Sequence, residues 1–498
     1  MKIEIESPIN KYYVQTLCMI FFPGSKFGDE CDEDIPRSLY LKTSASEEGI
    51  TSYAKMYYGE KMGEAEHYVE YSASRTKERT LKLAVGLAVL SCGVSILGYR
   101  PAWGMLVGVR PSKVATEMLN SGMSKTKVKK TLTSDYLVIP KKAALAVDVA
   151  LNEKRIVGAP DVKDCSMYIS IPFCPSRCTY CSFVSYTSNR LLALIPEYLD
   201  KLLHDIETNF KVINELGLNL KTIYIGGGTP TILDADQLEA LLSKINSLTD
   251  VAKLEEYTLE SGRPDTITAE KLSIAKTYGV NRICVNPQTM CDEILCGIGR
   301  NHTVEDFYRA FDIAKQSGIK TINVDLIAGL PGDNFKTFAK TIDSVLKLEP
   351  ENITVHTFCV KRSAEIRKLN SDIYTANNVD TGKCVDYAQI KASQNMYLPY
   401  YMYRQKNSAG NYENVGFSKE GHEGLYNIYM MEELHSIFAV GAGAVTKLVD
   451  NRDDDLCPDN KKIVRLFNQK YPYEYLSEDR SEDFYKAAVD FYRERNMI

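Results

Sequence analysis

The chain has 498 residues, of which 44% are hydrophobic and 25% are charged, and this balance excludes a disordered chain, a coiled coil or a collagen-like rod. Its 60 Lys and Arg residues against 65 Asp and Glu residues give a net charge of −5, which argues against a nucleic-acid-binding protein. The thirteen cysteines are an odd number in a long chain, so we expect free thiols in a reducing, cytoplasmic compartment and not a disulfide framework.

The N-terminal part, residues 1–160, is predicted to be an accessory domain of mixed α and β structure. It opens with a strand-like MKIEIE, without the basic and apolar regions of a targeting signal. The apolar segment Leu83–Gly98 is shorter than the roughly 20 residues needed to span a bilayer. Because Gly86, Gly93 and Ser95 also interrupt it, we expect a buried core helix and no membrane span. The basic run Lys125–Lys130 is interpreted as the solvated face of a helix.

Residues 161–370 are predicted to form strands that alternate with helices, and this segment is the predicted core barrel. Helical spacing lies between the strands, as at Leu238, Leu241, Leu242 and Ile245. Six units are too few for a closed eight-stranded barrel, so the predicted fold is α/β, a partial (β/α)6 parallel TIM-like barrel. Residues 371–498 are predicted to form a smaller C-terminal domain that covers the substrate. The six predicted strands are Met167–Ile171, Thr222–Ile225, Tyr257–Glu260, Arg282–Val285, Ile322–Ile327 and Ile353–Phe358.

A cysteine run follows the first of these strands. In YISIPFCPSRCTYCSF, Cys174, Cys178 and Cys181 have the spacing C-x3-C-x2-C. Three thiolates so close together favour a soft metal centre. A zinc site usually pairs two C-x2-C knuckles, and no second knuckle is present, so a [4Fe–4S] cluster with one open iron is favoured over zinc and over plain buried cysteines.

Further polar and glycine residues fall at or just after the ends of later strands. Each has a structural interpretation as well as a functional one: a turn for the glycines, a helix cap for Glu260, a buried ion pair for Asp325. Parallel barrels place their chemistry on this rim, which favours one shared site. The residues are Gly227, Gly228 and Thr229 in GGGTPT, Glu260, Gln288, Arg300 and Asp325.

These motifs resemble those of the radical S-adenosylmethionine (SAM) superfamily, with Tyr180 before the third cysteine. The resemblance implies that Cys174, Cys178 and Cys181 hold a [4Fe–4S] cluster whose open iron chelates SAM. An electron then cleaves SAM to methionine and a 5′-deoxyadenosyl radical, which abstracts hydrogen from a substrate. By position, the resemblance implies that SAM is held by Gly227, Gly228, Thr229, Glu260, Gln288, Arg300 and Asp325, with Arg263 and Asp265 as partners of Glu260.

The order of the motifs over residues 165–360 is similar to that of the oxygen-independent coproporphyrinogen III oxidase group. GVRPSK and MYRQKNSAGNYENVGF are similar to its longer subgroup, the coproporphyrinogen dehydrogenases. The implied reaction converts two propionates of coproporphyrinogen III to vinyl groups: hydrogen leaves the β-carbon, CO2 is released and one electron passes to an acceptor. A reducing donor of the flavodoxin or ferredoxin type is implied as a partner. Tyr168 and Arg404 are the candidate catalytic residues. Arg404 and Lys406 either meet substrate carboxylates or are surface charges on a loop, and both interpretations stay open.

Three positions depart from the established oxidases of this group. Phe183 replaces a fourth cysteine, Ser170 replaces a histidine, and Asn286-Pro287 replaces Gly-Val before Gln288. Two other functions therefore stay open: a haem chaperone that delivers haem without decarboxylation, and a radical SAM enzyme that methylates or opens another tetrapyrrole.

Several other side chains are interpreted as structural. His422 and His435 are expected not to bind haem, and Cys284, Cys291 and Cys296 are treated as ordinary thiols. Tyrosines such as Tyr397 and Tyr400 fit a macrocycle or a C-terminal core equally well.

Overall fold

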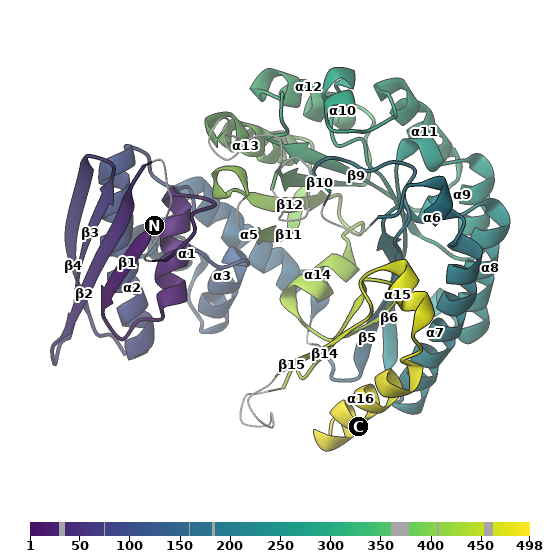
Figure 1. Cartoon of the computed structure of the whole chain (residues 1–498), viewed down its shortest axis with the longest axis horizontal. Helices are drawn as coiled ribbons and strands as arrows, with labels where there is room; N and C mark the ends of the chain where they lie inside the picture. Colours follow the sequence, from purple (N-terminus) through teal and green to yellow (C-terminus); the bar gives the residue numbers. More distant parts are fainter. Residues whose placement is uncertain are drawn as a thin grey trace. The chain divides into compact units, whose positions relative to one another are not determined.

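The computed structural model describes residues 1–28, 35–73, 75–158, 160–181, 185–359, 378–405, 408–452 and 462–498. The chain divides into two compact units, whose elements are labelled in Figure 1. Unit 1 comprises Met1–Leu151, Ser371–Gly382 and Met402–Glu413, and unit 2 comprises Asn152–Asn370, Lys383–Tyr401 and Asn414–Ile498. The chain after Asn414 thus belongs to the same unit as the predicted barrel strands, and the division into three domains stays a prediction.

Unit 1 is built on a four-stranded sheet in the order β1-β2-β3-β4, with β1 and β2 parallel and the other pairs antiparallel. Helix α2 packs against β3 and β4, and α1 packs against α2. The elements are β1 (Lys2–Glu6), α1 (Lys11–Phe21), β2 (Arg37–Ala45), β3 (Gly49–Tyr58), β4 (Lys61–Glu70), α2 (Lys77–Leu97), α3 (Pro111–Asn120), α4 (Lys125–Ser134) and α5 (Pro140–Val157).

Helix α2 is the predicted apolar helix. Within the described residues it is the one helix that is long and apolar enough to cross a membrane, and most of its apolar stretch is buried inside the protein. Gly93 lets the ring of Phe21 approach, because a Cβ at Gly93 would lie 2.2 Å from that ring. The glycines that interrupt the apolar run therefore serve close packing.

Unit 2 contains the six predicted parallel strands in sequential order, and the fold is a partial TIM-like barrel as predicted. Each strand has a buried apolar residue, such as Ile169, Leu259 or Val324, next to a residue that faces the opposite side. The strands are β5 (Asp164–Ile171), β6 (Asn219–Gly227), β7 (Glu256–Gly262), β8 (Arg282–Val285), β9 (Thr321–Ala328) and β10 (Asn352–Thr357).

The C-terminal chain extends this sheet on both sides. The whole sheet has the order β11-β12-β10-β9-β8-β7-β6-β5-β13-β14-β15. Strand β12 is antiparallel to β10, whereas β13 is parallel to β5 and pairs Ala439 with Tyr168. The added elements are β11 (Leu398–Arg404), β12 (Glu413–Ser418), α14 (Leu425–Glu432), β13 (Ser436–Val440), β14 (Val445–Val449), β15 (Ile463–Phe467), α15 (Pro472–Ser477) and α16 (Ser481–Glu494).

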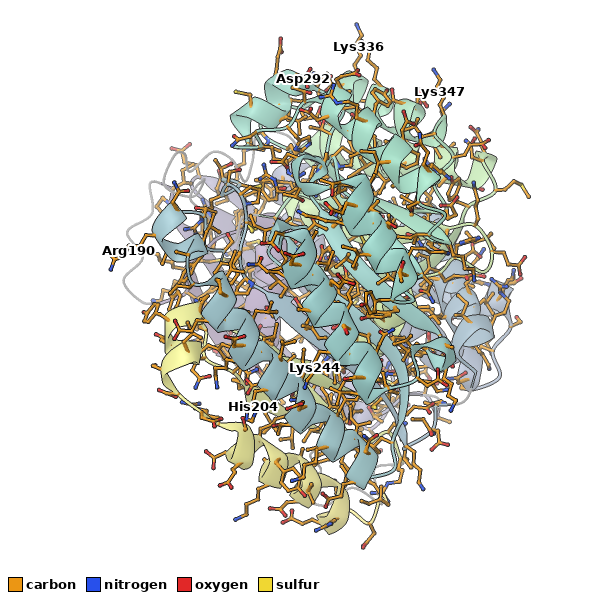
Figure 2. The ribbon with its side chains drawn as sticks, turned by 90° about the vertical axis from the view of Figure 1, so that its right-hand side faces the viewer. Arg190, His204, Lys244, Asp292, Lys336 and Lys347 are labelled. Atoms are coloured by element: carbon orange, nitrogen blue, oxygen red, sulfur yellow. The ribbon has the colours of Figure 1, made fainter. Side chains whose placement is uncertain are left out.

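Helices that connect the parallel strands follow one another around the outside of the sheet (Figure 1). Figure 2 shows the protein from the side of this helical layer. The exposed side chains of Arg190, Lys336 and Lys347 project from it. The layer covers the outer face of the strands, so the inner face and the strand ends are left to form a site. The helices are α6 (Asn189–Leu192), α7 (Ile195–Glu215), α8 (Ala235–Leu248), α9 (Ala269–Thr277), α10 (Asp292–Gly297), α11 (Val304–Gln316), α12 (Phe335–Leu346) and α13 (Asn378–Gln394).

Candidate functional site

Five polar or aromatic side chains line the inner face of the barrel, one from each of five parallel strands. They are partly exposed, whereas their immediate neighbours along the strands are mostly buried. In β5 and β6 the two tyrosines stand opposite each other in the register. Because successive side chains of a strand point to opposite faces, this alternation places one row toward the barrel interior. The row consists of Tyr168, Tyr224, Glu260, Asp325 and His356.

The loop that carries the three cysteines begins two residues after β5 and is fixed by backbone hydrogen bonds. The N–H of Cys174 donates to the carbonyl of Tyr186 at 3.0 Å, and the N–H of Thr179 donates to the carbonyl of Ile298 at 3.0 Å. Within the loop, the N–H of Cys181 donates to the carbonyl of Cys178 at 3.1 Å. The loop is therefore held both by the segment that follows it and by the end of α10.

The glycine motif after β6 packs directly on this loop. The hydroxyl of Thr229 donates to Sγ of Cys174 at 3.3 Å, and the N–H of Thr229 donates to the carbonyl of Phe173 at 2.8 Å. A Cβ at Gly228 would lie 2.5 Å from the carbonyl oxygen of Phe173 and 2.9 Å from Sγ of Cys174. Only glycine fits at this position without moving the loop.

The donor set of this loop fits an iron–sulfur cluster. Burial, together with the two other thiols, raises the pKa of Cys174 to about 11. Metal binding requires thiolates and would displace these protons. In the described part of the chain no three Cys, His, Asp or Glu side chains are already gathered at metal-binding distances. Phe183, at the fourth position of the run, lies outside the described residues.

Glu260 lies deep in the barrel, next to the glycine motif. Burial and the nearby charge of Asp325 raise its pKa to about 8, although Tyr224 and the N–H of Gly227 donate hydrogen bonds to its carboxyl group. A Cβ at Gly226 would lie 2.7 Å from Oε2 of Glu260. The carboxyl group is thus packed against the glycine backbone at the end of β6.

Asp325 has the partners that a carboxylate in an apolar strand requires. Burial disfavours its charge, yet the neighbouring imidazole of His356 and the hydrogen bond from Asn323 lower its pKa below the ordinary value. Nδ2 of Asn323 donates to Oδ1 of Asp325 at 2.7 Å, and Nε2 of His356 lies 3.8 Å from Oδ2. The neighbours of this carboxylate are therefore an amide and an imidazole.

Gln288 and Arg300 each present a buried polar atom that has no hydrogen-bond partner among the described residues: Oε1 of Gln288 and Nε of Arg300. Gln288 adopts a φ of 69°, and its N–H donates to the carbonyl of Asp325 at 3.1 Å. Arg300 lies beside Tyr180 and Cys178, and its guanidinium group donates to the carbonyl of Asn286. Buried polar atoms without partners are rare in folded proteins and are expected where a ligand binds.

Arg263 and Asp265 form an ion pair with each other. Nε of Arg263 donates to Oδ1 of Asp265 at 3.0 Å, and Nη2 donates to Oδ2 at 3.2 Å. The guanidinium group is directed at the cysteine loop, where Nη1 donates to Oγ of Ser176 at 2.8 Å. The pair therefore belongs to the cluster end of the site.

An aromatic stack lines one side of the barrel interior. The ring centroids of Tyr168 and Tyr224 are 6.1 Å apart, those of Tyr224 and Tyr426 are 4.7 Å apart, and the planes of each pair differ by less than 30°. Tyr426 comes from α14, far along the sequence, and neither it nor His356 was expected at the site. His356 could have been recognised as the inward residue of β10 from the alternation of side chains between the two faces of that strand.

The predicted catalytic residue Arg404 belongs to unit 1. Its guanidinium group donates to the carbonyl of Asn411 at 3.1 Å and to the carbonyl of Leu106, and it lies over the ring of Trp103. Burial lowers the pKa of Arg404 to about 10. Its contact with a substrate carboxylate stays a prediction, and the companion Lys406 lies outside the described residues.

Other side chains have structural partners. Nε2 of His435 is 2.8 Å from Oγ of Ser166, and Nδ1 of His422 is 2.8 Å from Oγ1 of Thr321. The hydroxyl of Tyr397 donates to the carbonyl of Pro350, and that of Tyr400 donates to Oδ1 of Asn352 at 3.4 Å. The two tyrosines therefore pack in the protein core.

Comparison with known proteins identifies the family of the chain. Residues 168–345 match the family model of the radical SAM superfamily. Over 473 residues the chain is 34% identical to the oxygen-independent coproporphyrinogen-III oxidase-like protein HemZ of Bacillus subtilis, covering 93% of this chain and 92% of that protein. The chain belongs to the radical SAM superfamily and to this oxidase-like group.

Radical SAM membership implies a [4Fe–4S] cluster and SAM as cofactors. A second relative is the haem chaperone HemW of Bacillus subtilis, 32% identical over 64% of this chain and 80% of the chaperone. Among solved structures, coproporphyrinogen III oxidase (HemN) from Escherichia coli superposes with a TM-score of 0.50, at 18% identity, over 68% of this chain and 73% of that one. This last likeness concerns the fold.

Proposed function

We propose that this radical SAM protein oxidatively decarboxylates two propionates of coproporphyrinogen III to vinyl groups, giving protoporphyrinogen IX. The observation that carries the proposal is the similarity to the coproporphyrinogen-III oxidase-like protein over nearly the full length of both chains. The chaperone match covers only 64% of this chain. We place the protein in the cytoplasm, with a flavodoxin or ferredoxin type of electron donor as its partner.

The proposed cofactor ligands are residues that lie at or after the ends of the parallel strands. Cys174, Cys178 and Cys181 hold the cluster, and the cluster with SAM supplies a radical that abstracts hydrogen. Oε1 of Gln288 and Nε of Arg300, which are buried without hydrogen-bond partners among the described residues, provide an acceptor and a donor for SAM. The backbone of Gly227, Gly228 and Thr229, together with Glu260 and Asp325, completes the proposed SAM site.

The protonation of Glu260 bears on how SAM is held. Since its pKa is raised to about 8, the carboxyl group is mainly neutral at pH 7 before a ligand enters. An approaching cationic amino group stabilises the carboxylate, because an opposite charge lowers the pKa of an acid. Glu260 is then expected to release its proton when SAM binds.

The aromatic stack of Tyr168, Tyr224 and Tyr426 offers flat surfaces for a tetrapyrrole. Tyr168, on the strand that leads to the cysteine loop, is the proposed catalytic residue on this side. Arg404 is the proposed cation that pairs with a propionate of the substrate. This role accompanies the prediction that the C-terminal chain covers the substrate.

The deciding experiment is an anaerobic incubation of cluster-reconstituted protein with coproporphyrinogen III, SAM and a strong reductant. Formation of protoporphyrinogen and CO2 supports the proposal. Tight haem binding without SAM-dependent turnover would favour the haem chaperone instead. Methylation or opening of a tetrapyrrole ring would assign the third function considered above. Replacement of Cys178 by Ala should abolish the visible absorbance of the cluster in each case.

A further inference from the structure

Arg263 is a buried cation that lies beside the cysteine loop. It follows Gly262 at the end of β7, and only 3% of its side chain is exposed. The carboxylate of Asp265 accepts two hydrogen bonds from the guanidinium group of Arg263, and these fix the plane of that group. The remaining nitrogen, Nη1, is thereby directed away from Asp265.

That remaining nitrogen reaches the loop at two residues. It donates to Oγ of Ser176 at 2.8 Å and to the carbonyl of Ser176 at 3.4 Å, and it lies 3.9 Å from Sγ of Cys178. Oγ of Ser176 in turn donates to the carbonyl of Gly299 at 3.3 Å. The guanidinium group therefore holds the middle of the loop and carries a positive charge next to one sulfur.

A charge in this place has a defined effect on an iron–sulfur cluster. Reduction adds an electron to the cluster, so nearby positive charge and hydrogen bonds to the sulfurs favour the reduced form and raise the reduction potential. Asp265 offsets part of this effect, but its side chain is 27% exposed, so solvent screens its charge more than that of Arg263.

We propose that Arg263 is a positioning residue for the cluster: through Cys178 and Ser176 it fixes the loop, and it raises the reduction potential of the cluster. The proposal rests on a cluster held by Cys174, Cys178 and Cys181. It does not depend on which substrate the enzyme uses, and it can be tested without one.

The test is a potentiometric titration of the full-length, reconstituted protein, followed by electron paramagnetic resonance of the reduced cluster in the absence of SAM and substrate. In Arg263→Gln the charge is lost, so the midpoint potential is expected to be more negative than in the wild type at equal iron and sulfide content. In Arg263→Lys the charge remains, but the two hydrogen bonds of the guanidinium group to Asp265 are lost. The midpoint potential is therefore expected to lie between those of the wild type and Arg263→Gln.

The matched control is Arg309→Gln, because Arg309 is an exposed arginine of α11 that pairs with Asp306. Its potential should equal that of the wild type. A wild-type potential in Arg263→Gln would overturn the proposal. If that variant cannot hold a cluster, Arg263→Lys decides: a potential below the wild type supports the proposal, whereas an unchanged potential, or loss of the cluster in this variant too, overturns it.

Discussion

Glu260 and Asp325 are two inward-facing acids of one barrel that respond oppositely to their surroundings. Burial and the charge of Asp325 raise the pKa of Glu260 to about 8, whereas Asn323 and His356 keep the pKa of Asp325 below its ordinary value. One acid is thus neutral and the other ionised at pH 7, which avoids two adjacent negative charges in a buried site.

The first prediction concerns the stability of the cofactor-free protein. The folded pKa of Glu260 is about 8 and its ordinary value is 4.5, so the unfolded chain loses this proton first as the pH rises. Stability therefore falls between about pH 5 and pH 8, by up to ~1.4 kcal/mol per pH unit from this group. In Glu260→Gln, the melting temperature should fall less over this range, whereas Glu197→Gln, an exposed control, should follow the wild type. Parallel pH profiles for Glu260→Gln and the wild type would contradict the pKa assigned to Glu260.

A second prediction follows from the contact between Gly228 and the cysteine loop. In Gly228→Ala the added Cβ would meet the carbonyl oxygen of Phe173 and the sulfur of Cys174, so the loop must shift. We expect a destabilisation of about 1–3 kcal/mol and a reduced iron content after reconstitution. The control is Gly297→Ala, since a Cβ at Gly297 meets nothing within 4 Å. Equal iron content in both variants would show that the loop tolerates the shift.

The third prediction addresses the buried ion pair of unit 1. Nζ of Lys142 donates to Oε1 of Glu413, both side chains are fully buried, and Nε1 of Trp103 donates to Oε2 of Glu413 at 2.7 Å. In Lys142→Met the carboxylate loses its cation, and we expect a loss of about 3–5 kcal/mol in unfolding free energy.

Trp103 is the only tryptophan of the chain, so its fluorescence during urea unfolding reports on this unit. Replacing both Lys142 and Glu413 by Met removes the unpaired charge as well and should recover much of the loss. A Lys142→Met variant that unfolds at the same urea concentration as the wild type would mean that the pair contributes no net stability.

The fourth prediction separates backbone strain from ligand binding at Gln288. A non-glycine residue at a φ of 69° costs roughly 1–2 kcal/mol. Gln288→Gly should therefore be at least as stable as the wild type, yet bind SAM at least tenfold more weakly because the amide is lost. Met396→Gly is the control: Met396 also has a positive φ, of 65°, but is 82% exposed. Thermal melting and equilibrium dialysis of SAM on cluster-loaded protein measure the two effects, and unchanged SAM affinity in Gln288→Gly would remove Gln288 from the SAM site.

The six parallel strands could be predicted because each is a short apolar run with a turn signal at its end. The two strands Ser436–Val440 and Val445–Val449, which lie on either side of a glycine-rich turn, carry no such signal. Every residue of the first is buried, so it has no alternation that would reveal a strand.

The side-chain partners of the site were less accessible to sequence reasoning. The cysteines and glycines lie in local motifs, whose order along the chain resembles that of a known superfamily. The approach of Arg263 to Cys178, or of Tyr426 to Tyr224, joins segments 85 and 202 positions apart. Nothing local marks such pairs, because the sheet order and the turns between elements decide which side chains meet.

The parallel pairing of β5 with β13 has a consequence for synthesis on the ribosome. Until Ser436–Val440 has been made, the strand that leads to the cysteine loop has β6 on one side and an open edge on the other. Open strand edges invite pairing with other chains. The last sixty or so residues, which include β13, therefore cover this open edge of β5. A nascent chain that ends before them would be expected to aggregate, although it already contains the proposed metal ligands.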